Sequence, residues 1–362
     1  MMNIQQVFPD IGQLELDNLT ASIHDKWLTE GPFCNRFIEE SLAITGAKHA
    51  VLAPNGTLGL YLALLALELK PGSEVIVPSF TFYASAMAVY FAGLIPVFVD
   101  VEPSTYNIDI DKTRNLITPN TSAVMPVHIY GQSADMAALT ELCDERKIKI
   151  VEDAAQGFGV NYNGQHTGTI GDVGVISFFA DKTITMGEGA LILTDNEDIY
   201  NKLKLLRNQG RPNSGTFIHP SLGMNFRITD LQAGVGCAQL ARLPSIIAGK
   251  KKNHAIYKEY LGNSSSLVLH EPSLGSEYVP FRFAFTSAKK EQISNHLEKN
   301  GVQTRSYFYP MHMQPMLTKY KRSIDMSVSE KLFETGVCLP IHNGLSDDEI
   351  RSICELVLEI AQ

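Results

Sequence analysis

The sequence predicts an α/β fold: a mainly parallel central sheet covered by helices, followed by a smaller α+β domain. First, short apolar runs alternate with stretches of helical periodicity from residue 50 to residue 152, an order typical of βαβ units. Second, the order changes to strand, helix, strand, strand and helix from about residue 267. We therefore divide the chain into residues 1–245, a large α/β domain with an N-terminal helix, and residues 246–362, a small C-terminal α+β domain.

The elements of the large domain follow from apolar runs and the residues that break them. Apolar residues recur at helical spacing within residues 1–30, and Gly31-Pro32 ends that helix. Val- and Ile-rich runs between turn residues indicate strands, and the longer apolar stretches between them indicate helices. The predicted strands are 50–53, 74–78, 96–101, 123–129, 148–152, 173–179 and 190–194, and the helices are 58–69, 83–92, 110–117, 134–147, 198–207 and 229–243.

An irregular connection and the small domain complete the chain. Residues 208–226 are rich in Gly, Pro and Asn, which favour turns over regular structure. The final helix opens with the capping box Ser346-Asp347-Asp348-Glu349 and continues with apolar residues on one face. The other predicted elements of the small domain are helix 246–261, strand 281–285, helix 289–299, and strands 302–307 and 337–340.

Composition limits the partners. The chain has 362 residues, of which 44% are hydrophobic and 19% charged, so it can bury a sizeable core. A net charge of −9 argues against nucleic acid and membrane surfaces as partners, because both attract clustered Lys and Arg. Five scattered cysteines without a Cys-x-x-Cys pair predict no disulfide framework and no metal site. With no signal peptide and no run of 18 apolar residues, we expect a cytoplasmic location.

One lysine stands in an unusual setting. Residues 173–179 and 190–194 are apolar runs that predict a buried pair of strands, and the polar turn between them carries Lys182. Burial disfavours an ammonium, so such a lysine can have a lowered pKa and act as a nucleophilic amine. That is the property needed to form a Schiff base with a carbonyl cofactor. The alternative is a solvated lysine at a hairpin tip.

Polar residues at other strand ends match a pyridoxal phosphate site. Asp153 follows an apolar strand, and a carboxylate there can keep a pyridine nitrogen protonated. Gly56 and Thr57 open an apolar helix, whose free N–H groups and hydroxyl can hold a phosphate. Ser177 can add a second hydroxyl, and Phe82 can lie on the face of the ring. Each residue alone is equally typical of a helix cap, a turn or the core; their order along one predicted sheet favours a single cofactor.

Motifs along nearly the whole chain carry a resemblance to a known family. The motifs are WLTEGP (27–32), NGT (55–57), TF (81–82), PVFVD (96–100), VHIYGQ (127–132), EDAAQ (152–156), SFFADK (177–182), GEG (187–189), RNQG (207–210), GMNFR (223–227), YPMH (309–312) and LPIH (339–342). On these motifs the chain resembles the pyridoxal-phosphate-dependent nucleotide-sugar aminotransferases of the DegT/DnrJ/EryC1/StrS group. This resemblance implies the aspartate aminotransferase-like fold, known as fold type I.

The resemblance also implies roles for individual residues. Lys182 would bond to the cofactor and then shuttle protons, and Asp153 would pair with the pyridine nitrogen. In this family an asparagine matching Asn225 reaches the phosphate held by the neighbouring subunit, which implies a homodimer with shared active sites. The remaining implied contacts are Gly56, Thr57, Phe82, Gln156 and Ser177 for the cofactor and, for the sugar nucleotide, Trp27, Gly31, Tyr309 and His312.

The implied reaction has two halves. An amino acid, usually glutamate in this family, converts the cofactor to pyridoxamine 5'-phosphate, and a nucleotide-linked keto sugar then accepts the amine. Segments 178–185 and 304–312 resemble those of family members that act on GDP-4-keto-6-deoxymannose, which implies amination at C4 of that sugar, and UDP- or dTDP-linked 4-keto or 3-keto sugars stay open. The sequence departs from the family at Asp181, where asparagine is common, and at Ala190, where a third glycine is frequent.

Two other functions stay open. Family members with histidine at the lysine position remove a sugar hydroxyl, and Lys182 speaks against that dehydration. Some relatives are non-enzymatic regulatory proteins, which the presence of Lys182, Asp153, Thr57 and Ser177 argues against. A dinucleotide-binding dehydrogenase is disfavoured, because the first strand is followed by Asn-Gly-Thr and no Gly-x-Gly-x-x-Gly motif occurs there.

Overall fold

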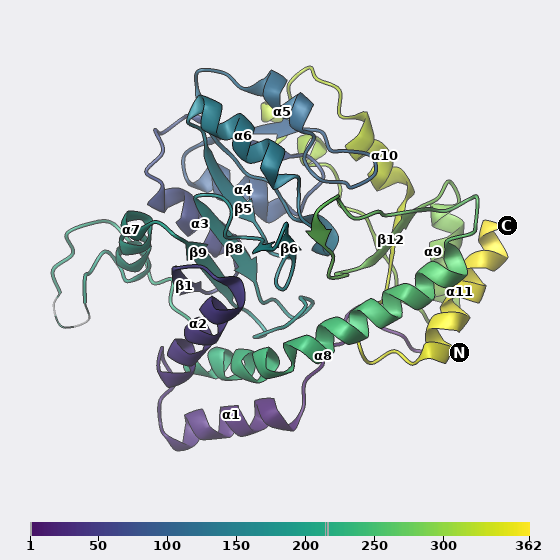
Figure 1. Ribbon diagram of the computed structural model, residues 1–362, viewed down its shortest axis with the longest axis horizontal. Coiled ribbons are helices and arrows are strands. Elements are labelled where there is room, and N and C mark those ends of the chain that lie inside the picture. The colour runs from purple at the N-terminus through teal and green to yellow at the C-terminus, as the bar shows by residue number, and fades with distance from the viewer. Residues whose placement is uncertain (1, 214, 216) are drawn as a thin grey trace.

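A central sheet organises the fold (Figure 1). The computed structural model describes residues 2–213, 215 and 217–362, and within them the sheet has seven strands. The predicted mainly parallel arrangement is confirmed: of these seven strands, β9 runs opposite to the other six. The strand order is β1 (His49–Ala53), β9 (Ala190–Thr194), β8 (Val173–Ser177), β5 (Lys149–Asp153), β4 (Thr121–Val124), β2 (Glu74–Pro78) and β3 (Ile95–Val99).

Helices cover both faces of this sheet. Successive strand residues point to opposite faces, so Val51 and Ala53 join one hydrophobic cluster and Leu52 joins another. The first face is covered by α3 (Gly56–Ala66), α4 (Tyr83–Phe91) and α7 (Glu197–Arg207). The second is covered by α2 (Pro32–Thr45), the first half of α8 (Asp230–Leu261), α5 (Ile110–Leu116) and α6 (Met136–Arg146).

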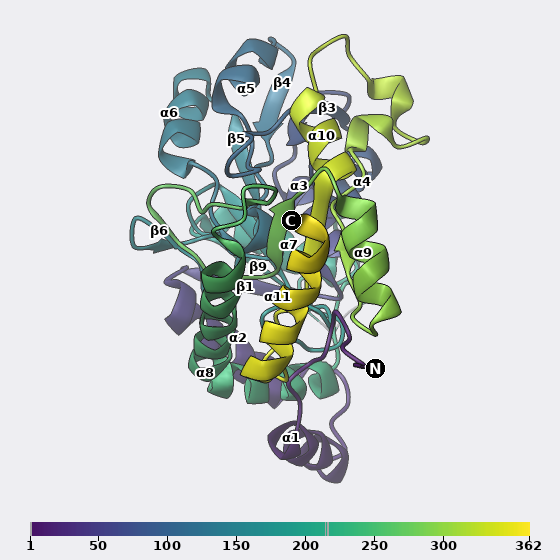
Figure 2. The same cartoon turned by 90° about the vertical axis from the view of Figure 1, so that its right-hand side faces the viewer.

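The C-terminal part has its own antiparallel sheet and core (Figure 2). Its strand order is β10 (Val268–Leu269), β12 (Phe283–Thr286), β14 (Gly336–Leu339) and β13 (Arg305–Ser306). The covering helices α9 (Lys290–Lys299) and α11 (Asp347–Ala361) bury this core, and Ile4 from the N-terminal segment joins it through a bridge to Val302. A third sheet consists of β11 (Ser276–Glu277), β6 (Asn161–Tyr162) and β7 (Gln165–His166). No helix of the described chain is long and apolar enough to cross a membrane.

The prediction of two helices at 229–243 and 246–261 is wrong. The structure has one helix, α8, that continues through Pro244 and links the central sheet to the C-terminal core. A proline inside a helix costs about 3 kcal/mol. Burial on both sides of the proline offsets this cost, because Leu240 and Leu243 pack in one core and Tyr257 and Leu261 in the other. The predicted domain division at residue 245 falls within this helix and stays a prediction.

The N-terminal helix is shorter than predicted, and two helices were missed. Within residues 1–30 the described helix is α1 (Gln13–His24), and Lys26 then has a positive φ of 57°. Gly31-Pro32 ends that region but also starts α2, because proline suits the first turn of a helix. The other missed helix is α10 (Ser327–Thr335), which precedes β14. The predicted strand 302–307 is reduced to the two residues of β13.

A buried carboxylate fixes the loop beside strand β5. Glu152 is fully buried, and its side chain accepts hydrogen bonds from His128 Nε2 at 2.8 Å and from the N–H groups of Gly168, Ile170 and Gly171. Burial alone would raise the pKa of Glu152, but the bonds from His128 and the backbone outweigh it and lower the pKa below its ordinary value. The carboxylate therefore stabilises the fold in its charged form.

We expect Glu152→Gln to lower the free energy of unfolding by about 2–3 kcal/mol at pH 7, because hydrogen bonds to a charged group are lost. A depressed folded pKa gives stability that is present above the unfolded pKa and is lost as pH falls through the folded value, so the difference from wild type should shrink below about pH 4. Urea unfolding at several pH values measures this. The control Glu141→Gln changes an exposed residue of α6; an equal loss in both variants would contradict the assignment.

Candidate active site

A cavity of about 870 Å³ lies at the carboxyl ends of the central strands. Residues after β1 and β2 and at the ends of β5 and β8 form one wall, as expected for ligand sites in parallel sheets. Residues of the C-terminal part form the opposite wall. The predicted site residues that line it are Gly56, Thr57, Phe82, Asp153, Gln156, Ser177, Lys182 and Tyr309.

A cradle for a phosphate forms where α3 meets β8. Asn55 caps α3 by accepting a hydrogen bond from Leu58 N at 3.0 Å, which leaves the first N–H groups of the helix facing the cavity. Gly56 lies against Ser177: a Cβ at this position would lie 3.0 Å from the Cβ and 3.1 Å from the Oγ of Ser177. Thr57, which is exposed at the cavity, adds a second hydroxyl. A side chain larger than hydrogen at position 56 would therefore crowd the Ser177 hydroxyl.

Lys182 lies in the turn of the β8–β9 hairpin, as predicted. Its side chain is 15% exposed, and its backbone N–H donates to the Phe179 carbonyl at 3.0 Å. Burial lowers the pKa of Lys182 below its ordinary value, and the negative charges of Asp181 and Asp153 oppose this effect. A larger share of this amine is therefore neutral near pH 7 than in a solvated lysine, and the neutral form is the nucleophile.

Asp153 lies at the end of β5 with its carboxylate fixed. Ser85 Oγ donates to Oδ2 at 2.7 Å, and Ala155 N donates to Oδ1 at 3.1 Å. Burial raises the pKa of Asp153, whereas these bonds and the charge of Lys182 lower it. A cation facing this carboxylate, such as a protonated pyridine nitrogen, would remove part of the cost of burying the charge.

Two further side chains suit a flat ring between the cradle and the carboxylate. Phe82 precedes α4 and is 60% exposed, so its face is free to cover a bound ring. Gln156 is held because its Oε1 accepts from Tyr130 N at 2.6 Å. A phosphate cradle, a fixed carboxylate and an amine in one cavity fit pyridoxal 5'-phosphate.

Four predicted residues do not line this cavity within the described chain. Asn225 is exposed, and its Oδ1 accepts from Arg227 N at 3.2 Å. Trp27 lies against Gly31, where a Cβ would come within 2.0 Å of the indole ring. His312 is buried between Ser79 Oγ, at 2.7 Å, and Glu330 Oε1, at 3.0 Å. Their predicted roles stay predictions.

The cavity also contains residues that sequence reasoning missed. Arg282 and Arg305 bring two guanidinium groups to the wall opposite the central sheet, and Glu188 adds a carboxylate. Arg305 lies within segment 304–312, whose resemblance to the family already points to substrate binding. Arg282 follows an apolar run, and its contacts come from distant parts of the chain. No local pattern therefore marks it as a site residue.

Fold and site together define a pyridoxal-phosphate-dependent aminotransferase, and comparison with known proteins gives the family. The model of the DegT/DnrJ/EryC1/StrS aminotransferase family matches residues 9–358, and the chain belongs to this family. GDP-perosamine synthase of Caulobacter vibrioides is 35% identical over 349 residues, covering 94% of each chain. UDP-N-acetyl-3-dehydro-alpha-D-glucosamine 3-aminotransferase of Acidithiobacillus ferrooxidans is 35% identical over 325 residues, covering 89% of this chain and 87% of its own.

A solved structure agrees with this assignment. DesV of S. venezuelae superposes with a TM-score of 0.92 at 30% identity, covering 96% of this chain and 94% of its own. The predicted fold type and the cofactor, pyridoxal 5'-phosphate, are confirmed. The residues that hold the cofactor in this chain stay a proposal.

We expect Gly56→Ala to weaken binding of pyridoxal 5'-phosphate about tenfold or more, which corresponds to about 1.4 kcal/mol. The added Cβ would press on Ser177 and displace the hydroxyl from the cradle. Titration of cofactor-free protein, followed by absorption, measures the affinity. The matched control is Gly234→Ala in α8, where a Cβ meets only ordinary contacts of 3.5 Å or more; equal affinities of both variants would argue against the cradle.

Proposed function

We propose that this chain moves the amino group of an amino acid, glutamate in the first instance, to C4 of a nucleotide-linked 4-keto-6-deoxy sugar. The preferred acceptor is GDP-4-keto-6-deoxymannose, giving GDP-perosamine, and a cytoplasmic location goes with this proposal. The observation that carries the chemistry is the pairing of Lys182 and Asp153 in one cavity. The preference for the sugar is supported by the full-length similarity to GDP-perosamine synthase. A role in assembling a surface polysaccharide such as an O-antigen would follow from that product.

Different residues of this chain bind the cofactor and transfer protons. Gly56, Thr57 and Ser177 hold the cofactor phosphate, and Asp153 holds a proton on the ring nitrogen. When bound, the cofactor supplies an electron sink that stabilises negative charge on the substrate carbon. Lys182 is both the general base and the general acid of the 1,3-proton shift in each half-reaction.

Alternative acceptors differ in their nucleotide or in the carbon that receives the amine. The relative that acts on a UDP-linked 3-dehydro sugar is as identical to this chain as the perosamine synthase is, although over a smaller share of its length. Dehydration is disfavoured, because the lysine that anchors the cofactor is present. A panel of sugars therefore identifies the acceptor, and substitution of Lys182 tests the type of reaction.

We expect the purified protein to show a visible absorption band of the cofactor that glutamate bleaches and one keto sugar restores. The panel contains GDP-, UDP- and dTDP-4-keto-6-deoxy sugars. Lys182→Ala should lose the band and lower turnover at least about 100-fold, since it removes the general acid and base. Lys204→Ala, on the exposed face of α7, is the control and should behave as wild type. A band that survives Lys182→Ala would refute the site assignment.

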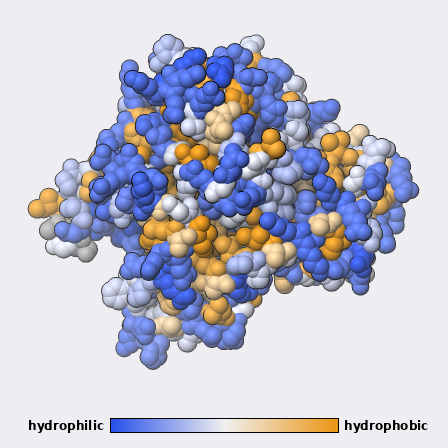
Figure 3. Space-filling view, viewed as in Figure 1, coloured by the Kyte–Doolittle hydropathy of each residue, from blue (hydrophilic) through white to orange (hydrophobic). Residues whose placement is uncertain are grey.

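A homodimer with shared sites is part of the proposal. Residues 217–224 lie on a loop that follows α7 and extends from the body, with hydrophobic surface at its tip (Figures 1 and 3). Phe217 is 91% and Leu222 90% exposed, an arrangement that costs free energy unless another surface covers it. Leu16 and Ile23 of α1 are also exposed. Burial of these residues in a second copy would bring Asn225 to the partner's cavity.

Shared sites predict complementation between two inactive variants. In a mixed dimer of Lys182→Ala and Asn225→Ala subunits, one site has both wild-type residues and the other has neither. Equal mixing by refolding should therefore restore about one quarter of wild-type turnover, because half of the dimers are mixed and half of their sites are intact. Turnover of the mixture is compared with each variant alone. No recovery, with dimers present by light scattering, would contradict shared sites.

A further inference from the structure

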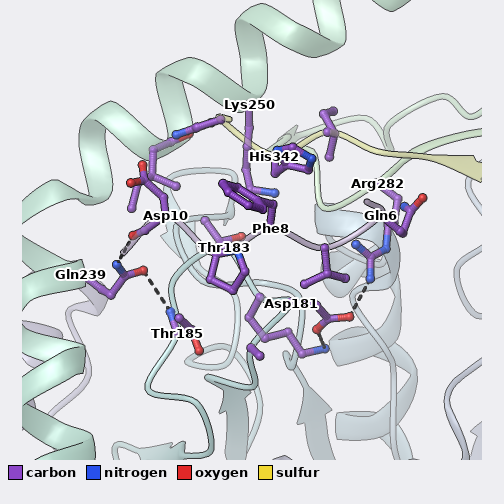
Figure 4. Close-up of a pocket in the computed structure, with 17 residues that line it drawn as sticks. Gln6, Phe8, Asp10, Asp181, Thr183, Thr185, Gln239, Lys250, Arg282 and His342 are labelled. Atoms are coloured by element: carbon purple, nitrogen blue, oxygen red, sulfur yellow. Dashed lines mark hydrogen bonds and ion pairs between the residues drawn. The ribbon is translucent and has the colours of Figure 1, made fainter. Parts of the chain in front are cut away.

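Three residues form a wall between two cavities. Asp181, Lys182 and Arg282 line the main cavity and also a smaller one of about 40 Å³ behind it, which we term the rear cavity (Figure 4). Residues 6–10 of the N-terminal segment line the rear cavity, and so do Lys250 and His342. Lys182 therefore has neighbours on the side away from the cofactor cradle.

Asp181 and Arg282 form a buried ion pair at this wall. Arg282 Nη2 donates to Asp181 Oδ2 at 2.6 Å, and Arg282 is 6% exposed. The guanidinium carbon lies 4.3 Å from the centroid of the Phe281 ring, which restricts its position. In Figure 4 the two side chains face each other beneath Gln6. One oxygen of the Asp181 carboxylate is thus held by a guanidinium whose position is restricted by burial and by the Phe281 ring.

The other oxygen points toward the amine. Asp181 Oδ1 is buried, has no hydrogen-bond partner in the described part of the chain, and lies 3.9 Å from Lys182 Nζ. Lys182 Nζ lies 4.8 Å from the centroid of the same Phe281 ring. A buried acceptor without a partner is costly, so a small rotation of Lys182 that brings Nζ into hydrogen-bond range would satisfy both groups.

We propose that Asp181, oriented by Arg282, is a positioning residue that holds Lys182 whenever the lysine is protonated and free of the cofactor. The inference rests on the proposed role of Lys182 as proton carrier. When the amine takes a proton from the substrate carbon, the resulting ammonium donates a hydrogen bond to Oδ1. The ammonium then delivers a proton to the other end of the 1,3-shift, so Lys182 becomes neutral again and Asp181 stays a carboxylate throughout.

The charges around Lys182 give this proposal a signature. Asp181 and Asp153 favour the ammonium; Arg282 and Arg305 disfavour it. Lys250 and His342 face the pair from α8 and from the segment after β14. Removing the charge of Asp181 should lower the pKa of Lys182, whereas removing that of Arg282 should raise it. Opposite shifts would show that both charges act on the amine, and recovery of the wild-type pKa in Asp181→Glu would show that a carboxylate at this position is what holds the ammonium.

Position 181 carries aspartate, where asparagine is common in the family. Asparagine, which is common before the lysine in this family, could accept a hydrogen bond but carries no charge. Aspartate adds a negative charge, and burying an unpaired carboxylate would be costly. The ion pair with Arg282 offsets part of this cost. The two residues are separated by 101 positions, so neither alone indicates the pair.

The test is the pH dependence of acylation by acetic anhydride, which reacts with neutral amines, on the cofactor-free full-length chain. Mass spectrometry quantifies the peptide that carries Lys182. Asp181→Asn should lower the midpoint of Lys182 reactivity by about one pH unit, and Arg282→Gln should raise it. Asp181→Glu should restore the wild-type midpoint. The control Asp10→Asn removes a carboxylate that lines the rear cavity but pairs with Arg242, and it should leave the midpoint within about 0.3 units.

Equal midpoints in wild type and Asp181→Asn, or shifts of both variants in one direction, would overturn the proposal. If Asp181→Asn does not fold, Arg282→Gln decides alone, and an unchanged or lower midpoint counts against the proposal. If neither folds, the double variant Asp181→Asn/Arg282→Gln should have a lower midpoint than wild type, because the charge of Asp181 acts on Lys182 more strongly than that of Arg282. The labelling uses neither cofactor nor substrate, so it is independent of whether the proposed reaction is correct.

Discussion

The burial of one amine is the constraint on which the site depends. β8 and β9 are packed on both faces, and the turn between them places Lys182 where water reaches only part of the side chain. Exclusion of water disfavours the ammonium and makes the lysine nucleophilic, but it also raises the cost of every other charge nearby. Each ionic group near Lys182 therefore needs a fixed partner: Ser85 for Asp153, and Arg282 for Asp181.

The same constraint explains why the C-terminal part is held so firmly to the central sheet. It supplies Phe281, Arg282 and Arg305 to the wall opposite the cradle. α8 runs without interruption from one core to the other, despite Pro244, and the segment that starts at Ile4 crosses back over the rear cavity. These links keep the spacing between the two walls, and a displacement of one ångström there can cost catalysis heavily.

The sequence predicted what is local and missed what is distant. Gly56, Asp153, Ser177 and Lys182 each follow or end a strand with a clear apolar pattern, and parallel strands bring such ends together. The sequence signal for α2 is ambiguous, because Gly31-Pro32 can end one helix and proline also suits the first turn of the next. The pairing of Asp181 with Arg282, and the burial of His312 against Ser79, join residues 101 and 233 positions apart, and such packing leaves no periodic signal.

The balance of charge in the cavity reconciles two demands on Lys182. As a base the lysine must be neutral, and as an acid it must be charged, so neither form can be strongly favoured. Burial and the guanidinium groups of Arg282 and Arg305 favour the neutral amine; Asp181 and Asp153 favour the ammonium. Because Arg282 both pairs with Asp181 and opposes it, the carboxylate can approach the amine without holding it permanently protonated. Loss of either member would leave the lysine better suited to one of the two proton transfers in each half-reaction and worse suited to the other.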